Sequence, residues 1–83
     1  MYNYFKSKNM ITIEKIKWKI AEVIRHGEMT QAELARCIGV KQQQISCYLK
    51  GQKAPALDTF AKLCAVLDLD ANEILCVDEH SYN

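Results

Sequence analysis

Long hydrophobic runs are missing from this 83-residue sequence. No apolar stretch is long enough to span a bilayer, and none has the form of a signal peptide, so we expect a cytoplasmic protein without a membrane contact. Alternation of Val, Ile and Thr with polar residues never lasts long enough to form a sheet, and internal repeats and low-complexity segments are also missing. The sequence therefore predicts an all-α fold of five helices.

The sequence also lacks the residue spacings that carry most catalytic and metal chemistry. Its four cysteines, Cys37, Cys47, Cys64 and Cys76, include no CxxC pair and have no histidine at a zinc-finger spacing. Core packing is the favoured interpretation for Cys64, which falls on the apolar face of its predicted helix. Neither a nucleophile–base arrangement nor a phosphate-binding loop can be found. We therefore expect a protein that is not an enzyme and needs no cofactor or metal.

Net charge is only +1, but the charge is unevenly divided along the chain. Residues 1–53 hold ten Lys and Arg against four Asp and Glu, a net charge of +6, whereas residues 54–83 hold one against six, a net charge of −5. Such an asymmetry puts positive potential on one half of the domain, which favours a nucleic acid as partner. A chance division of charge on a solvated surface is the alternative interpretation.

The most informative stretch runs from Thr30 to Gly51 and reads TQAELARCIGVKQQQISCYLKG. Thr30 and Glu33 have the spacing of a capping box, which predicts a helix that begins at about Gln31. Gly39 is suited to the positive φ found beyond a helix end, so this helix should end just before it. The stretch therefore predicts two short helices joined by a tight glycine turn.

The second of these helices is expected from about Lys41 to Leu49. Ile45, Tyr48 and Leu49 share one face, which should pack on the core. The opposite face is polar and carries Gln43, Cys47 and Lys50, flanked by Gln42 and Ser46.

Three further helices complete the predicted domain. They are expected from the N-cap Thr12 to Gly27, from about Leu57 to Leu67, and from Asp70 through Ile74 and Leu75 as far as about Val77. Trp18 lies off the apolar stripe of the first helix, and it could cover a neighbouring helix, pack on the N-terminal arm or join a dimer contact; partial burial is expected for it. The inward residues should include Ile13, Ile16, Ile20, Val23, Ile24, Leu57, Phe60, Leu63, Cys64 and Leu67. Residues 12–77 would form the domain, residues 1–11 a flexible N-terminal arm and residues 78–83 a frayed tail.

The stretch resembles the helix-turn-helix of the Cro and repressor (Xre) family of phage and bacterial regulators. The matching residues are Gln31, Ala35, Gly39, Val40, Ile45, Ser46, Tyr48 and Gly51 within the motif, then Pro55, Leu57, Phe60, Leu63, Leu67 and Asn72 to Leu75 beyond it. The resemblance implies a five-helix, lambda-repressor-like domain that binds double-stranded DNA in a sequence-specific manner as a transcriptional regulator. An antitoxin or another protein-binding module on the same scaffold is the alternative function.

Three departures from the family pattern are informative. Many members pair an arginine in the first helix with a glutamate late in the recognition helix, and this chain has Ile24 and Leu49 there; packed apolar residues can replace such a pair without loss of stability. The usual serine or threonine before the recognition helix is Lys41, and the usual cap before the fourth helix is Ala56. Each lost cap costs about 1 kcal/mol.

These features predict the DNA contacts and the assembly. Amide side chains can bond adenine at two atoms in the major groove, although consecutive glutamines are also ordinary helix formers on a solvated face. The predicted base-reading residues are Lys41, Gln42, Gln43 and Cys47, and the predicted phosphate-binding residues are Gln31, Gln44, Ser46, Lys50 and Lys53. Cys47 could touch DNA, oxidise, or do neither.

The expected partners are a DNA operator and a second copy of the chain, at least on DNA. Ile74, Leu75 and Val77 are the candidate residues of the dimer interface. A protein partner such as a toxin or an antirepressor is left open. Lys6 and Lys8 could let the N-terminal arm reach around the duplex; a disordered terminus or an upstream alternative start before Met10 is the other interpretation.

Overall fold

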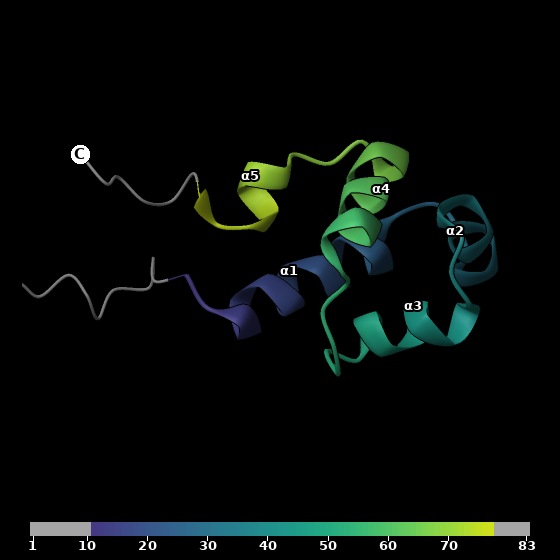
Figure 1. Ribbon diagram of the computed structural model, residues 1–83, viewed down its shortest axis with the longest axis horizontal. Coiled ribbons are helices and arrows are strands. Elements are labelled where there is room, and N and C mark those ends of the chain that lie inside the picture. The colour runs from purple at the N-terminus through teal and green to yellow at the C-terminus, as the bar shows by residue number, and fades with distance from the viewer. Residues whose placement is uncertain (1–10, 78–83) are drawn as a thin grey trace, which may run out of the picture.

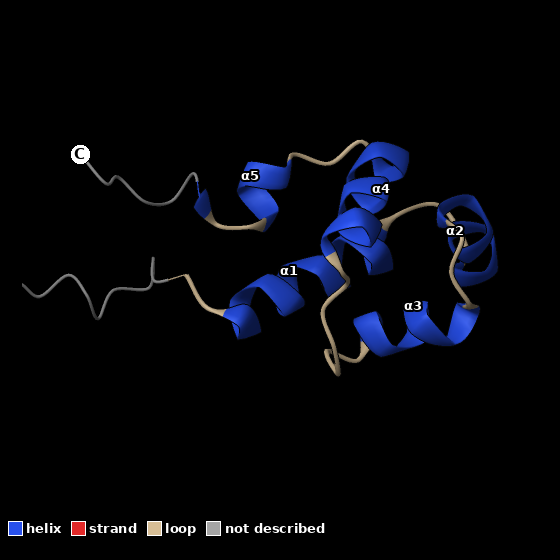
Figure 2. Cartoon of the chain, in the orientation of Figure 1, coloured by secondary structure: helices blue, strands red, loops and turns tan. Residues whose placement is uncertain are grey.

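The computed structural model describes residues 11–77, and within this range it contains five helices and no strand (Figures 1 and 2). The helices are α1 (Ile13–His26), α2 (Gln31–Ile38), α3 (Gln42–Leu49), α4 (Leu57–Leu67) and α5 (Ala71–Ile74). The all-α prediction with five helices is therefore confirmed. The predicted arm, with Lys6 and Lys8, and the predicted tail lie almost entirely outside the described residues.

Local capping signals account for where α1 begins and ends. The Thr12 side chain accepts a hydrogen bond from the Lys15 backbone N–H at 3.1 Å, as expected of an N-cap. Glu14 stands in the first turn, and Arg25 and His26 stand in the last, so the charges at both ends complement the helix dipole. The helix then ends before Gly27, as predicted.

Helix α4 begins without a side-chain cap, whereas α5 begins with one. Ala56 provides no side-chain cap for α4, and this helix ends at Asp68, which adopts the left-handed conformation with φ 56°. Asp70 accepts from the Asn72 backbone N–H at 3.0 Å and begins α5. The prediction that this last helix reaches Val77 is wrong, because α5 ends at Ile74 and Cys76 has a φ of 67°, which cannot continue a right-handed helix.

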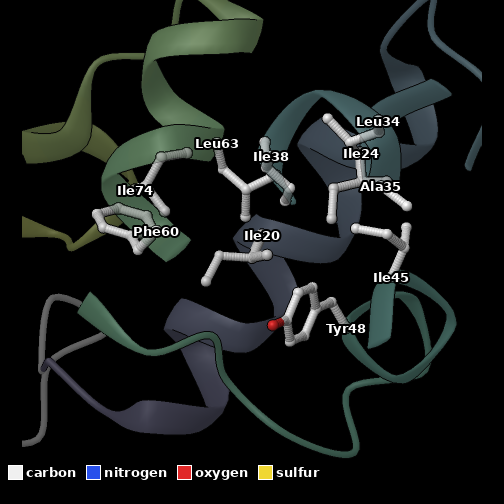
Figure 3. Packing of buried hydrophobic residues seen from close by; sticks show 10 residues of the cluster. All are labelled: Ile20, Ile24, Leu34, Ala35, Ile38, Ile45, Tyr48, Phe60, Leu63 and Ile74. Carbon is white, nitrogen blue, oxygen red and sulfur yellow. The ribbon is translucent and has the colours of Figure 1, made fainter. Parts of the chain in front are cut away.

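One apolar core joins all five helices (Figure 3). Helix α3 packs against both α1 and α2, while α2 also packs against α4, and α1 packs against α5. The Lys19 ammonium on α1 donates to the Glu73 carbonyl on α5 at 3.0 Å, which ties the short last helix to the first. The buried cluster is Ile20, Ile24, Leu34, Ala35, Ile38, Ile45, Tyr48, Phe60, Leu63 and Ile74.

Two predicted core residues are on the surface instead. Leu57 is 83% exposed and Ile13 is 47% exposed. Each is the first residue of its helix and precedes the turns that neighbouring helices cover. Trp18, for which partial burial was expected, also lies mainly in solvent, with 62% of its surface exposed.

Cys64 behaves as its position on the apolar face predicted. It is partly buried and packs against the core, and burial raises the pKa of its thiol. All four cysteines lie in the described part of the chain and are free thiols.

Candidate nucleic-acid interface

The start of α2 is fixed by the capping box that the sequence predicts. The Glu33 backbone N–H donates to the Thr30 hydroxyl at 3.1 Å, and the Thr30 backbone N–H donates to the Glu33 carboxylate at 2.9 Å. Both orphan donors are satisfied, so the first turn of α2 has a defined position. This turn presents Gln31, the first residue of the helix, at the surface.

The same hydrogen bonds make the stability of α2 depend on pH. The Thr30 backbone N–H, followed by the Thr30 side chain, lowers the pKa of Glu33 below its ordinary 4.5. The stabilisation from the ionised carboxylate is therefore present above the ordinary pKa and is lost as the pH falls through the lowered one. We expect Glu33→Gln to lower the midpoint of urea unfolding at pH 7 and to have a much smaller effect in strong acid.

A matched variant separates this effect from a general change of charge. Glu28 is exposed in the loop before α2, so Glu28→Gln removes the same charge nearby without touching the capping box. A difference between the Glu33→Gln and wild-type midpoints that stays constant from pH 7 into strong acid would contradict the prediction.

The turn between α2 and α3 depends on one glycine. Gly39 has a φ of 76°, and the backbone N–H groups of Gly39 and Val40 both donate to the Ala35 carbonyl, at 2.9 and 3.0 Å. This pattern terminates a helix with a residue in the left-handed region, which glycine adopts without strain. The chain therefore leaves α2 abruptly, and α3 begins at Gln42 after a connection of three residues.

Helix α3 is held to the core along one face. Ile45 and Tyr48 point into the core beside residues of α1 (Figure 3), and they are 0% and 2% exposed. Burial raises the pKa of the Tyr48 hydroxyl, so the side chain stays neutral. With this face fixed, the residues at the start of α3 turn outward, and Lys41, Gln42 and Gln43 are exposed as predicted.

The loss of a cap at Lys41 is partly compensated. A lysine side chain has no acceptor, so it leaves the first amide groups of α3 without a side-chain cap. The Gln44 side-chain oxygen, however, accepts from the Lys41 backbone N–H at 3.2 Å, which supplies the other half of a capping box. Gln44 thus has a structural role through its side-chain oxygen, which leaves the amide NH₂ group outside this capping interaction.

The structure brings together four of the predicted contact residues. Gln31 from α2 lines one shallow hollow with Gln42, Gln43 and Ser46 from α3. Lys50 stands at the other end of α3 and shares a second hollow with Gln31. Among the other predicted residues, Lys41 and Lys53 are exposed, while Gln44 and Cys47 are partly buried.

The surroundings of α3 are basic. Residues 41–53 include Lys41, Lys50 and Lys53 and contain neither Asp nor Glu. The carboxylates of the second half of the chain that the structure describes lie on α4 and α5 or at their ends. Three lysines and no carboxylate on the segment that carries the glutamines favour a positive potential beside them.

The expected apolar pair between α1 and α3 is present. Ile24 is buried in the core, Leu49 packs against the core, and both line the hollow that Gln31 and Lys50 share. The next residue, Arg25, was not predicted to have a role. Its guanidinium donates to the Leu49 carbonyl at 3.4 Å and to the Glu22 carboxylate at 2.6 Å.

Arg25 thereby satisfies a carbonyl at the end of α3 and places a cation beside the negative end of the helix dipole. The sequence did contain a signal for this role. Arg25 is a basic residue in the last turn of the first helix, and it directly follows Ile24, which stands where the family pattern has an arginine.

Two other kinds of feature are absent from the residues that the structure describes. Within residues 11–77, no group of three or more His, Cys, Asp or Glu side chains is close enough to hold a metal ion. None of the helices described by the structure is both long and apolar enough to cross a membrane.

Comparison with known proteins agrees with this geometry. A helix-turn-helix family model matches residues 20–74, which include the second half of α1 and the whole of α2, α3, α4 and α5. A comparison with curated proteins gave no match. Residues 20–74 make up more than half of the chain, and the observed fold is that of the family. The chain therefore belongs to the helix-turn-helix family of the Cro/C1 (Xre-like) type, a family of DNA-binding transcription regulators.

Proposed function

We propose that this protein binds a specific sequence of double-stranded DNA by placing α3 in the major groove. The observation that carries the proposal is the orientation of α3: Ile45 and Tyr48 anchor one face, so that Gln42 and Gln43 project outward from the first turn. In helix-turn-helix proteins the start of the recognition helix contacts the base edges. Amide side chains at this place can each make two hydrogen bonds to an adenine.

The contacts divide into those that read bases and those that position the protein. We assign base reading to Lys41, Gln42, Gln43 and Cys47. We assign phosphate contacts to Gln31, Gln44, Ser46, Lys50 and Lys53. Gln31 would donate from the first turn of α2, where free backbone N–H groups and the helix dipole already favour an anion.

Selection of bound sequences from a pool of random duplexes tests the proposed function. A regulator that reads bases should enrich one motif, with the strongest preference at the positions that face the start of α3. The same binding measured with unselected DNA gives the contribution of the phosphates alone. Equal affinity for the enriched motif and for unselected DNA would contradict sequence-specific binding.

Lys53 tests the assignment of a positioning contact. This residue is exposed in the loop after α3, where a lysine meets the phosphate backbone as a point charge. We expect Lys53→Ala to weaken binding to all sequences alike and to lower the salt slope by about one. Titrations at several salt concentrations measure both effects, and Lys62→Ala on the exposed surface of α4 is the matched control. A changed sequence preference in Lys53→Ala would exclude a purely positioning role.

We further propose that two copies bind a two-fold operator. The half-sites would then lie about 34 Å apart, one turn of DNA. One of the three interface residues predicted from the sequence is wrong, because Ile74 is only 4% exposed and belongs to the core of its own chain. Leu75 is partly buried and Val77 is 45% exposed, so Val77 is the best remaining candidate. Sedimentation that shows one copy both free and on a single half-site would contradict this assembly.

A further inference from the structure

An exposed tryptophan borders a hollow between α1 and the end of α3. Trp18 is 62% exposed, although a side chain of this size is usually well covered. The hollow beside it is lined from α1 by Glu14, Lys17, Trp18, Ala21 and Arg25, and from the end of α3 by Leu49, Lys50 and Gly51. The residues from α1 are spaced so that they form one stripe along the helix.

This hollow is continuous with the candidate DNA interface. The hollow that holds Gln42 and Gln43 shares Gln31 with the next one, and that second hollow shares Arg25, Leu49 and Lys50 with the one beside Trp18. A single surface therefore leads from the start of α3, past the start of α2, to the exposed stripe of α1.

The charge at the Trp18 end of this surface suits a polyanion. Lys17, Arg25 and Lys50 line the hollow there, against the single carboxylate of Glu14. Arg25 donates to Glu22 and to the Leu49 carbonyl, but a guanidinium has five N–H donors, so it can still receive a phosphate oxygen. Three cations against one carboxylate favour the sugar-phosphate backbone of DNA as the occupant, because Lys and Arg neutralise its phosphates.

We propose that the α1 stripe is a second DNA contact, which binds the sugar-phosphate backbone that flanks the half-site read by α3. Lys17, Arg25 and Lys50 hold the phosphates, and Trp18 packs against the strand. The inference rests on the proposed function, because the flanking strand is the continuation of the backbone that Gln31 contacts. It adds a footprint outside the helix-turn-helix, so affinity should depend on duplex length beyond the half-site.

Trp18 is the only tryptophan of the chain, so its fluorescence reports on this hollow alone. The intact protein is titrated with the selected duplex, and separately with a duplex trimmed at the flank of the half-site, while labelled DNA reports binding through its anisotropy. We expect quenching of Trp18 by acrylamide to fall several-fold on the long duplex and much less on the trimmed one.

Lys17→Gln provides an independent measurement. It should lower the salt slope by about one on the long duplex and leave the slope on the trimmed duplex unchanged. Lys62→Gln on α4 should leave both slopes at the wild-type value.

The outcomes separate the inference from the proposed function. DNA that binds by anisotropy while Trp18 remains equally open to acrylamide, and while Lys17→Gln keeps the wild-type slope, overturns the inference and leaves the proposed function intact. Shielding of Trp18 that grows with protein concentration in the absence of DNA also overturns it, because the occupant is then a second copy. If neither duplex binds, the proposed function fails, and the inference fails with it.

Discussion

Ile45→Ala should lower the free energy of unfolding by about 2–5 kcal/mol, the range found when a large aliphatic side chain is truncated in a packed core. Ile45 is 0% exposed and lies where α3 meets the rest of the core. Its loss removes buried apolar contacts and leaves a cavity between the recognition helix and the elements that orient it. A domain of 83 residues has little stability in reserve, so a large fraction of the molecules should be unfolded at moderate temperature.

Urea unfolding followed by circular dichroism measures this loss. Leu57→Ala is the matched control, because it removes an aliphatic side chain of the same size that is 83% exposed, and its effect should stay within about 0.5 kcal/mol. Equal losses for the two variants would show that the packing of α3 does not hold the domain together as the buried surface indicates.

The sequence was sufficient for helix positions where the signal is local. Thr12, the Thr30 and Glu33 pair, and Gly39 each act through hydrogen bonds or backbone angles within one turn of their own position. Such interactions do not depend on the rest of the fold, so spacing along the chain predicts them. The bounds of α1 and α2 accordingly agree with the predicted ones, and those of α4 agree although Ala56 gives it no side-chain cap.

The predictions that failed concern residues whose burial depends on tertiary packing. Leu57 and Ile13 have the apolar character of core residues, but a periodic pattern does not tell where the covering helices end. Ile74 was predicted to lie in a dimer interface because it is an apolar residue near the end of the chain. In the structure α5 folds back onto α1, and Ile74 is buried there.

In the candidate site, too, local features could be predicted from the sequence and tertiary contacts could not. The outward direction of Gln42 and Gln43 could be predicted, because the helical period fixes it once Ile45 and Tyr48 are placed inside. The contact between Arg25 and the Leu49 carbonyl joins residues 24 positions apart and depends on how α1 crosses α3. No pattern within one helix indicates such a contact, and the same is true of the surface that connects Gln31 with Trp18.

Gln43→Ala should cost about 1–3 kcal/mol of binding free energy at one base-pair position and relax the preference there. The reason is that truncation removes a side chain able to make two hydrogen bonds to an adenine, while the other contacts of α3 stay in place. Binding to a set of operators mutated one base pair at a time measures the effect. Gln52→Ala, an exposed glutamine in the loop after α3, is the control and should leave the profile unchanged.

The substitution is informative because it separates base reading from helix formation. Consecutive glutamines on a solvated face could simply be good helix formers, but alanine is a better one, so neither Gln43→Ala nor Gln42→Ala should weaken α3. Gln44→Ala would be ambiguous, since Gln44 also accepts from the Lys41 backbone N–H. In Gln43→Ala, a loss of preference confined to one base pair must therefore come from the lost Gln43 amide. If Gln42→Ala and Gln43→Ala both keep the wild-type affinity and the wild-type preference at every operator position, α3 does not read the sequence through these residues.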